Sequence, residues 1–302
     1  MARKERTVAE VIREHEASGT YFDVDGIKTF ALKYGRGETV LCIHGVPTSS
    51  FLYRKVLRSL EKKGYKGVSI DLPGLGLTDR PKNFDYSFSN LSDFVYKAAK
   101  ALKLKKFHLV VHDVGGPIGF ALAARHSNRI MSLTILNTWI DVVNFQKPVF
   151  MRPFEKRVLG EAELKMMTHL TWQVMFKSVG VVNTSRISGA EMNAYIDLLK
   201  RVDHGKAFLK IMRNFDHSAD FRELCLKAVQ NVTYPVQAIW GAKDPALTLE
   251  TYGEEIKKAA GLRELHTLRS KHLLQEEAWL SIADKIVDLA KAVHLQTTKK
   301  EA

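Results

Sequence analysis

The chain has 302 residues, of which 45% are apolar and 26% charged, a composition typical of a globular protein with a sizeable core. The net charge of +13 raises the question of nucleic-acid binding, but the lysines are spread along the chain and form no basic stripe with interleaved aromatic residues. Two cysteines, Cys42 and Cys225, are too few for a disulfide framework. We therefore expect neither a nucleic-acid-binding protein nor a disulfide-stabilised one.

The N-terminal segment MARKERTVAEVIREHEASG is charged throughout and has no apolar region of the kind found in signal peptides. No run in the chain approaches the roughly 18 apolar residues that a membrane span needs. Together these observations predict a cytoplasmic protein without a membrane partner.

In chain order, the first predicted element is a hairpin over YFDVDGIKTFALK, residues 21–33, which turns at Asp25-Gly26. Five continuous apolar runs follow, and each is typical of a strand buried on both faces. The runs are TVLCIHG (39–45), GVSIDLPG (67–74), FHLVVHD (107–113), IMSLTILN (130–137) and PVQAIWG (235–241).

Helical spacing of apolar residues alternates with these runs. The predicted helices span residues 50–62, 89–103, 116–126, 250–260 and about 273–294. Such alternation of strands and helices predicts an α/β fold with a mostly parallel sheet flanked by helices.

The alternation stops between about residues 140 and 221, where helical spacing and many Met, Phe and Trp residues replace strand-like runs. We interpret this stretch as an inserted helical cap over the C-terminal edge of the sheet, the edge at which such sheets bind ligands. The predicted division is a core of residues 1–139 and 222–302 and a cap of residues 140–221.

Asp113, in VVHDVGGPIG, lies where a predicted strand meets a helix rich in small residues. Many hydrolases carry the serine of G-x-S-x-G at this kind of junction, but this chain contains no such motif. Asp244, in WGAKDPALT, and His272, in RSKHLLQEE, come later at strand ends. Nucleophile, acid and base follow one another in this order in α/β hydrolases, so the three residues predict a catalytic triad.

The segment HGVPTSSFLYR, residues 44–54, follows the first buried run. We expect Gly45 to permit a sharp bend and Pro47 to fix the next one. The backbone N–H of Val46 would then face the site and be joined there by the N–H of Val114. Two such donors would form an oxyanion hole.

These segments together resemble the haloalkane dehalogenase group of the α/β-hydrolase superfamily, in which epoxide hydrolases are close relatives. The resemblance runs from about residue 21 to residue 294. It is carried in order by HGVPTSS, DLPGLGLTDRP, HDVGG, EMNAYIDLL, WGAKDP and KHLLQEE. It implies an α/β-hydrolase fold in which Asp113 is the nucleophile, His272 the base and Asp244 the acid.

The implied activity follows from placing a carboxylate where many hydrolases have a serine. A carboxylate can displace a leaving group from a saturated carbon, and water activated by His272 can then hydrolyse the resulting ester on Asp113. The expected partners are a small, largely apolar substrate and water. No cofactor or metal is expected, because the chain has no Cys/His cluster with ligand spacing and no G-x-G-x-x-G after a strand.

Two positions depart from the dehalogenase pattern. Dehalogenases commonly have a tryptophan directly after the nucleophile and an asparagine after the HG pair, and both donate hydrogen bonds to the departing halide. This chain has Val114 and Val46 instead. Trp139, in LNTWID, or Trp172, in the predicted cap, could replace these donors or could serve only in packing.

Several alternatives stay open on the sequence alone. Epoxide hydrolases typically use two cap tyrosines as acids, and the predicted cap has only Tyr195, which we group with Trp139 and Trp172 as predicted substrate-binding residues. An epoxide hydrolase or a β-lactone-opening enzyme of the same fold is one alternative. Asp141, close after Asn137, is a second candidate for the acid. A non-catalytic small-molecule receptor is the alternative from another class, but a receptor would not need Asp244 and His272 in register with a nucleophile.

Overall fold

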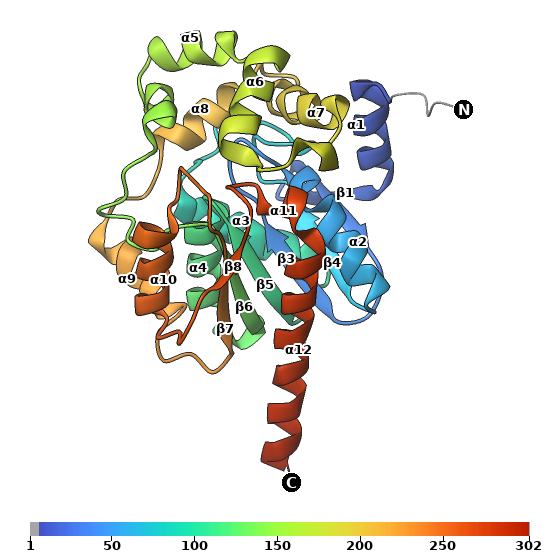
Figure 1. Cartoon of the computed structure of the whole chain (residues 1–302), viewed down its shortest axis with the longest axis vertical. Coiled ribbons are helices and arrows are strands. Elements are labelled where there is room, and N and C mark those ends of the chain that lie inside the picture. The colour runs from blue at the N-terminus through green and yellow to red at the C-terminus, as the bar shows by residue number, and fades with distance from the viewer. Residues whose placement is uncertain (1–5, 302) are drawn as a thin grey trace.

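The structure, a computed structural model, describes residues 6–301, with side chains as far as residue 295, and is built on a central eight-stranded sheet (Figure 1). The strand order is β1-β2-β4-β3-β5-β6-β7-β8. β2 runs antiparallel to both β1 and β4, and the other neighbouring pairs are parallel. The strands are β1 (Gly19–Val24), β2 (Ile27–Tyr34), β3 (Thr39–Ile43), β4 (Lys66–Ile70), β5 (Phe107–His112), β6 (Ile130–Leu136), β7 (Val236–Gly241) and β8 (His266–Leu268).

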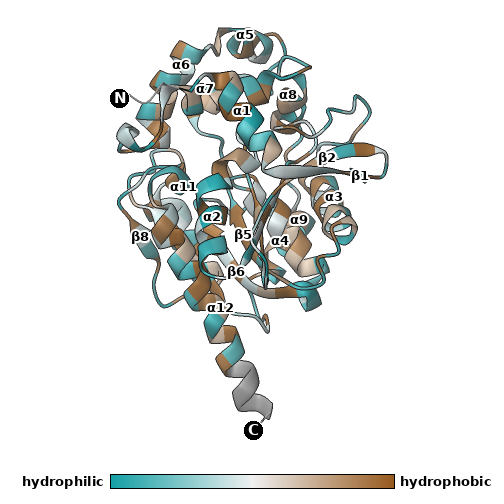
Figure 2. Ribbon diagram, turned by 90° about the vertical axis from the view of Figure 1, so that its right-hand side faces the viewer, coloured by the Kyte–Doolittle hydropathy of each residue, from teal (hydrophilic) through white to brown (hydrophobic). Residues whose placement is uncertain are grey.

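The predicted hairpin and the five predicted buried strands are confirmed as β1 to β7. The inner strands read as unbroken apolar runs because helices cover both faces of the sheet. In β3, for example, Val40, Leu41 and Cys42 are fully buried. Figure 2 shows α2 and α12 on one side of the sheet and α3, α4 and α9 on the other. The fold class predicted from the sequence is therefore correct.

The predicted helical patterns agree with helices that flank the sheet to within about two residues, except that α12 continues to Glu301. Helix α9, which no pattern predicted, packs against α4. The bounds of these flanking helices are η1 (Ser50–Tyr53), α2 (Arg54–Lys62), α3 (Phe88–Ala101), α4 (Gly115–Arg125), η2 (Ser127–Arg129), α9 (Ala219–Lys227), η6 (Leu249–Gly253), α10 (Glu254–Ala259), α11 (Leu274–Glu277) and α12 (Trp279–Glu301).

Residues 137–235, all of which the structure describes, contain no strand. Apart from α9, which flanks the sheet, the helices of this stretch lie above the sheet in Figure 1, and several of them line the cavity described below. Besides α9 they are η3 (Val149–Glu155), α5 (Leu159–Met166), α6 (His169–Met175), η4 (Phe176–Gly180), η5 (Thr184–Arg186), α7 (Gly189–Lys200) and α8 (Lys206–Arg213). We refer to the segment from η3 to α8 as the cap.

Besides α9 and the short η2, two further elements were not predicted. Helix α1 (Val8–Ala17) precedes the sheet and packs against α7 of the cap. Its start carries a capping box in which the Thr7 hydroxyl accepts from the N–H of Glu10 and the Glu10 carboxylate accepts from the N–H of Thr7. The second element is β8, whose three residues are too short for a periodic pattern. No helix in the described part of the chain is both long and apolar enough to cross a membrane.

Candidate active site

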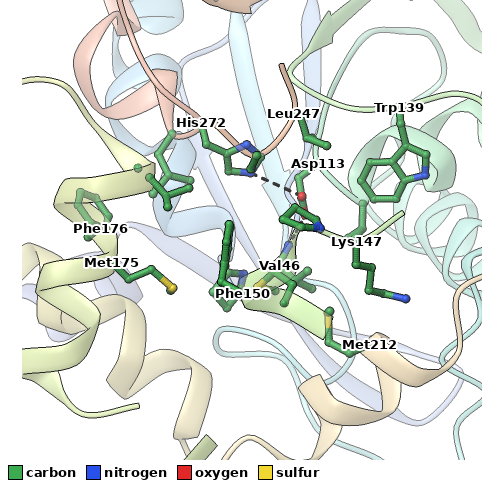
Figure 3. Close-up of a pocket in the computed structure, with 18 of the residues that line it drawn as sticks. Val46, Asp113, Trp139, Lys147, Phe150, Met175, Phe176, Met212, Leu247 and His272 are labelled. Carbon is green, nitrogen blue, oxygen red and sulfur yellow. Dashed lines mark hydrogen bonds and ion pairs between the residues drawn. The ribbon is translucent and has the colours of Figure 1, made fainter. Parts of the chain in front are cut away.

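Asp113 occupies a sharp turn between β5 and α4. Its φ of +54° lies in the left-handed region, which is uncommon for a residue other than glycine and often marks a functional position. The turn is held from three sides. The Asp113 N–H donates to the carbonyl of Asn137 at 3.0 Å, and the Asp113 carbonyl accepts from the Gly116 N–H at 2.8 Å and the Thr138 hydroxyl at 2.6 Å. The backbone is thus fixed while the carboxylate faces the cavity (Figure 3).

Two glycines leave room for this turn. A Cβ added to Gly45 would lie 2.2 Å from Oδ1 of Asp113, and one added to Gly115 would lie 2.5 Å from the carbonyl oxygen of Ile43. The sequence predicts that Gly45 permits a sharp bend, but Gly45 is not among the positive-φ glycines. A glycine is needed at position 45 because the Asp113 carboxylate approaches the backbone too closely for a side chain to fit.

The two carboxylate oxygens of Asp113 have different partners. Oδ1 accepts a hydrogen bond from the backbone N–H of Val46 at 2.8 Å, and Oδ2 lies 3.5 Å from Nε2 of His272. Val114, the residue before α4, lines the cavity beside the carboxylate. One oxygen is therefore held by the main chain, and the other faces the imidazole.

His272 is in turn bonded to Asp244. The ring Nδ1 of His272 donates to Oδ2 of Asp244 at 2.8 Å. The other oxygen of Asp244 accepts from the N–H groups of Ala246 at 2.8 Å and Leu247 at 3.1 Å. The structure thus brings together Asp113, His272 and Asp244, which the sequence places in three distant segments.

Asn137 positions Asp244 from the neighbouring strand. Its side-chain amide donates to Oδ2 of Asp244 at 2.6 Å, and its side-chain oxygen accepts from the N–H of Gly241 at 2.8 Å. Asn137 is fully buried, so both hydrogen bonds are shielded from water. Asp141, the second candidate for the acid, instead accepts hydrogen bonds from the N–H groups of Val143 and Asn144, both at 3.2 Å.

The charges around His272 favour its protonated form. Burial alone would lower the pKa of the imidazole, but the charge of Asp244 and hydrogen bonds to Asp113 and Asp244 raise it from 6.5 to about 10. Burial pushes the pKa of Asp244 upward, but His272 and Asn137 hold it below its usual value of 3.8. Without substrate, the site therefore contains an imidazolium between two carboxylates.

His112, whose role was not predicted, supports the segment that carries His272. Its Nε2–H donates to the backbone carbonyl of His272 at 2.9 Å, and the two rings lie 4.8 Å apart. Burial, followed by the nearby His272 charge, lowers the pKa of His112 to about 3, so this second imidazole stays neutral. The same segment is tied to η4 by hydrogen bonds from the N–H of His272 to the carbonyl of Val179 and from the N–H of Leu273 to the carbonyl of Gly180.

A cavity of about 670 Å³, counted with its open mouth, lies in front of Asp113 and His272. Its walls are mostly apolar, and the cap supplies many of them (Figure 3). The apolar side chains contributed by η3, α6, η4 and α8 are Phe150, Met151, Trp172, Met175, Phe176, Val179 and Met212. Such a site suits a small, largely apolar molecule.

The two tryptophans predicted to bind substrate do line this cavity. Trp139 stacks on Phe145 with the ring centroids 3.8 Å apart, and its buried indole N–H has no hydrogen-bond partner among the described residues. The indole N–H of Trp172 is used inside the cap, where it donates to the carbonyl of Met192 at 2.8 Å. Trp172 can therefore offer a substrate only its ring.

Tyr195, the third predicted substrate-binding residue, is not among the residues that line the cavity. It is 1% exposed, and its hydroxyl donates to the carboxylate of Glu276, which also pairs with Arg54 and Lys55. The helix face that carries Tyr195 is turned toward this buried ionic cluster. The structure therefore places Tyr195 outside the cavity that its predicted contact with substrate would require.

Lys147 is a cavity residue that sequence reasoning missed. It is 6% exposed, its Nζ lies 2.6 Å from a carboxylate oxygen of Glu155, and the same ammonium lies 3.7 Å from the ring centroid of Phe215. Burial lowers the pKa of Lys147 despite the opposing effect of Glu155. No sequence signal separates this lysine from the many others in the chain. Among the described residues, no group of three or more His, Cys, Asp or Glu side chains is placed to hold a metal ion.

Comparison with known proteins places this geometry in a family. Residues 38–278 match the family model of the alpha/beta hydrolase fold. Haloalkane dehalogenase 2 of Mycobacterium tuberculosis is 25% identical over 277 residues, which cover 89% of this chain and 93% of the dehalogenase. The cis-3-alkyl-4-alkyloxetan-2-one decarboxylase of Shewanella oneidensis is 39% identical over 117 residues, which cover 38% of this chain and 36% of that enzyme.

Among solved structures, an epoxide hydrolase from Vigna radiata has the same fold, with a TM-score of 0.75 and 21% identity over 91% of this chain and 97% of that one. The family model covers well over half of the chain. The protein therefore belongs to the alpha/beta hydrolase fold family and is a hydrolase that is similar in sequence to a haloalkane dehalogenase and shares its fold with an epoxide hydrolase.

Proposed function

We propose that this protein hydrolyses a small, largely apolar substrate through a covalent ester on Asp113. The main supporting observation is that the two oxygens of the Asp113 carboxylate have different partners. Oδ1 accepts a hydrogen bond from the Val46 N–H, whereas Oδ2 faces the cavity and His272. The proposal is also supported by the sequence segments that resemble haloalkane dehalogenases and by the 25% identity to haloalkane dehalogenase 2 of Mycobacterium tuberculosis.

In the first step, a lone pair of Asp113 Oδ2 attacks a saturated carbon of the substrate. The new C–O bond forms as the bond to the leaving group breaks, and the leaving group departs with the electron pair. The apolar walls of the cavity exclude water and leave the carboxylate poorly solvated, which favours this displacement.

In the second step, His272 acts as a general base. Ester formation removes the negative charge of Asp113, so the pKa of His272 falls and the imidazolium loses its proton to solvent water. Nε2 then takes a proton from water as the water oxygen attacks Cγ of Asp113. Asp244 stabilises the imidazolium, while the N–H groups of Val46 and Val114 stabilise the negative charge on Oδ1. As this state collapses, the bond between Cγ and the ester oxygen breaks, His272 returns its proton to that departing oxygen, and the alcohol is released while Asp113 regains its carboxyl group.

The choice of leaving group depends on the donors near Asp113. The side chains of Val46 and Val114 offer none, and the N–H of Trp172 is already used. In Figure 3 the indole nitrogen of Trp139 lies on the side of the ring away from Asp113. An opening epoxide would need an acid for its alkoxide, and Tyr195 does not line the cavity. Alkyl halides with easily released halides are therefore the first substrate class.

A β-lactone is the second candidate. Attack at its saturated ring carbon releases a carboxylate, which delocalises its charge and needs less help than an alkoxide. The specific observation that favours this class is the identity of 39% over 117 residues to the oxetan-2-one decarboxylase.

A single-turnover experiment in H₂¹⁸O tests the proposal. With enzyme in excess over a bromoalkane or a β-lactone, product alcohol from the first turnover should contain ordinary oxygen from Asp113, and the ¹⁸O should remain on the peptide that contains Asp113. A second turnover in the same solvent should then release labelled product. Label in the first product, with none on Asp113, would show that water attacks the substrate directly and would overturn the proposal.

A further inference from the structure

The outer surface of the cap is unusually apolar. Of the twelve large apolar side chains that are exposed in the described part of the chain, seven lie between residues 149 and 174. We call the following six the cap face: Phe150, Val158, Leu159, Met166, Leu170 and Val174. Leu170 and Val174 are four residues apart in α6 and so share one side of that helix. Figure 1 shows α5 and α6 at the end of the molecule opposite the C-terminal part of α12.

The same stretch is positively charged. Within residues 149–182, which the structure describes throughout, five basic side chains are exposed, whereas Glu161 is the exposed acid and already pairs with Arg213 at 2.9 Å. The exposed basic residues are Arg152, Lys156, Arg157, Lys165 and Lys177. Apolar side chains interspersed with lysine and arginine are the pattern of a surface that attracts and enters an anionic interface.

The cap face is continuous with the cavity. A groove on the cap is lined by Phe150, Met166 and Met175 among others, and three of its residues, Phe150, Trp172 and Met175, also line the cavity in front of Asp113. The same side chains therefore form the outer wall of the cavity and the inner wall of the groove. An apolar molecule in this groove would therefore be separated from the cavity by the side chains of Phe150, Trp172 and Met175.

We propose that the cap face docks on a lipid surface that contains anionic phospholipid, from which apolar substrate enters the cavity. A second copy of this chain fits less well, because a face-to-face contact would bring the same basic side chains together. Docking does not depend on the reaction at Asp113. If the aspartyl-ester mechanism were disproved, the docking proposal would still hold.

Vesicle flotation with the full chain tests the proposal. The vesicles are phosphatidylcholine alone and phosphatidylcholine mixed with phosphatidylglycerol. The wild-type chain should float with the mixed vesicles, should remain behind with phosphatidylcholine alone, and should be released from the mixed vesicles as salt is added.

Two variants separate the contribution of the charged side chains to vesicle binding from that of the apolar side chains. Neutralising three cap cations, as Lys156→Gln, Arg157→Gln and Lys165→Gln, should weaken binding to the mixed vesicles by roughly a hundredfold. The double variant Leu159→Ser and Leu170→Ser should weaken it by about tenfold or more. All five side chains are exposed, so the fold should be unaffected, which a thermal melt would verify.

Each variant has a matched control outside the cap face. The charge control is Lys62→Gln, Lys105→Gln and Lys106→Gln, and the apolar control is Leu280→Ser and Leu295→Ser on α12, all exposed positions. Both controls should bind like the wild-type chain. Absence of flotation, equal binding to phosphatidylcholine alone, or equal losses in variants and controls would overturn the proposal. So would a dimer in sedimentation velocity that the Leu159→Ser and Leu170→Ser variant abolishes, since the cap face would then bind a second copy.

Discussion

The carboxylate of Asp113 and the imidazole of His272 face each other across 3.5 Å, and Asp244 holds the far side of the same imidazole at 2.8 Å. In the substrate-free protein, this arrangement stabilises the protonated form of a residue that the proposed mechanism needs as a base. Alkylation of Asp113 would remove one of the two charges responsible. Formation of the ester would thus itself prepare His272 for the next step.

The first prediction concerns this coupling. In Asp113→Asn, the pKa of His272 should fall from about 10 toward its ordinary value of 6.5, because a charged partner is lost while Asp244 remains. An NMR pH titration of the His272 ring in wild type and variant measures this shift. Neutral His112, with its pKa of about 3, serves as an internal reference that should not titrate between pH 6 and 11. An unchanged His272 pKa would show that Asp113 does not contribute.

The second prediction concerns stability against pH. Because folding raises the pKa of His272, its contribution to the free energy of unfolding is fully present below about pH 6.5 and is lost as pH rises through about 10. The wild-type chain should therefore lose more stability between pH 6.5 and 10 than Asp113→Asn, in which the pKa is raised less. Urea unfolding of both proteins across this range measures the difference, and parallel curves would contradict the expectation.

The third prediction concerns the covalent intermediate. In His272→Ala, Asp113 can still attack but the ester cannot be hydrolysed, so the protein should gain the mass of the substrate's alkyl group. Peptide mass spectrometry should locate this group on Asp113. The double variant with Asp113→Asn, in which an amide replaces the nucleophile, should gain no mass. Unmodified His272→Ala after exposure to a substrate that the wild-type protein turns over would argue against His272 as the base.

The fourth prediction concerns leaving groups. A hydrogen bond to a charged partner contributes roughly 1.5–3 kcal/mol, and about 1.4 kcal/mol corresponds to a tenfold change in rate. Without side-chain donors at positions 46 and 114, cleavage of chloroalkanes should therefore be slower by roughly a hundredfold or more than with both donors present. Bromo- and iodoalkanes should suffer less, because their leaving groups need less stabilisation.

Initial rates on matched chloro-, bromo- and iodoalkanes measure this preference. The variant Val46→Asn with Val114→Trp should raise chloride release most, although the added volume can cost about 1–3 kcal/mol of stability. Val46→Leu with Val114→Phe adds volume without donors and is the control. Brisk release of chloride by the wild-type protein would refute the argument and direct attention to the unpartnered N–H of Trp139.

The fifth prediction follows from the corrected role of Tyr195. Tyr195→Phe removes a hydrogen bond to the buried carboxylate of Glu276 and should lower the free energy of unfolding by about 1–3 kcal/mol. Because Tyr195 does not line the cavity, KM and kcat for any substrate should stay close to the wild-type values. Chemical denaturation and steady-state kinetics separate the two effects. A large change in KM with unchanged stability would restore Tyr195 as a substrate contact.

The sheet and its reactive strand ends could be read from the sequence because both depend on short, local patterns. Buried parallel strands are unbroken apolar runs, and residues that follow such runs meet at one edge of the sheet. This reasoning places Asp113 at the turn after β5 and favours Asp244 over Asp141 as the partner of His272. The geometry agrees with both expectations, while the catalytic roles themselves remain predictions.

The walls of the cavity could not be read in the same way. Which face of a cap helix turns inward depends on packing between segments far apart in the chain, and Tyr195 is drawn to the buried Arg54–Glu276 pair rather than to the cavity. Lys147 and His112 act through partners that no local pattern reveals. By contrast, α1 could have been predicted from the capping box that begins at Thr7.

The hydrogen bond from position 46 to Asp113 comes from the main chain, whereas the side chain of the same residue lines the cavity. Almost any substitution at this position would change the surface that a substrate meets and leave the donor in place, and only proline would delete the N–H. Substitutions at this one position should therefore change substrate preference while preserving the main-chain hydrogen bond that the proposed covalent step uses. Position 46 is therefore a suitable site for mutations, natural or engineered, that aim to change specificity.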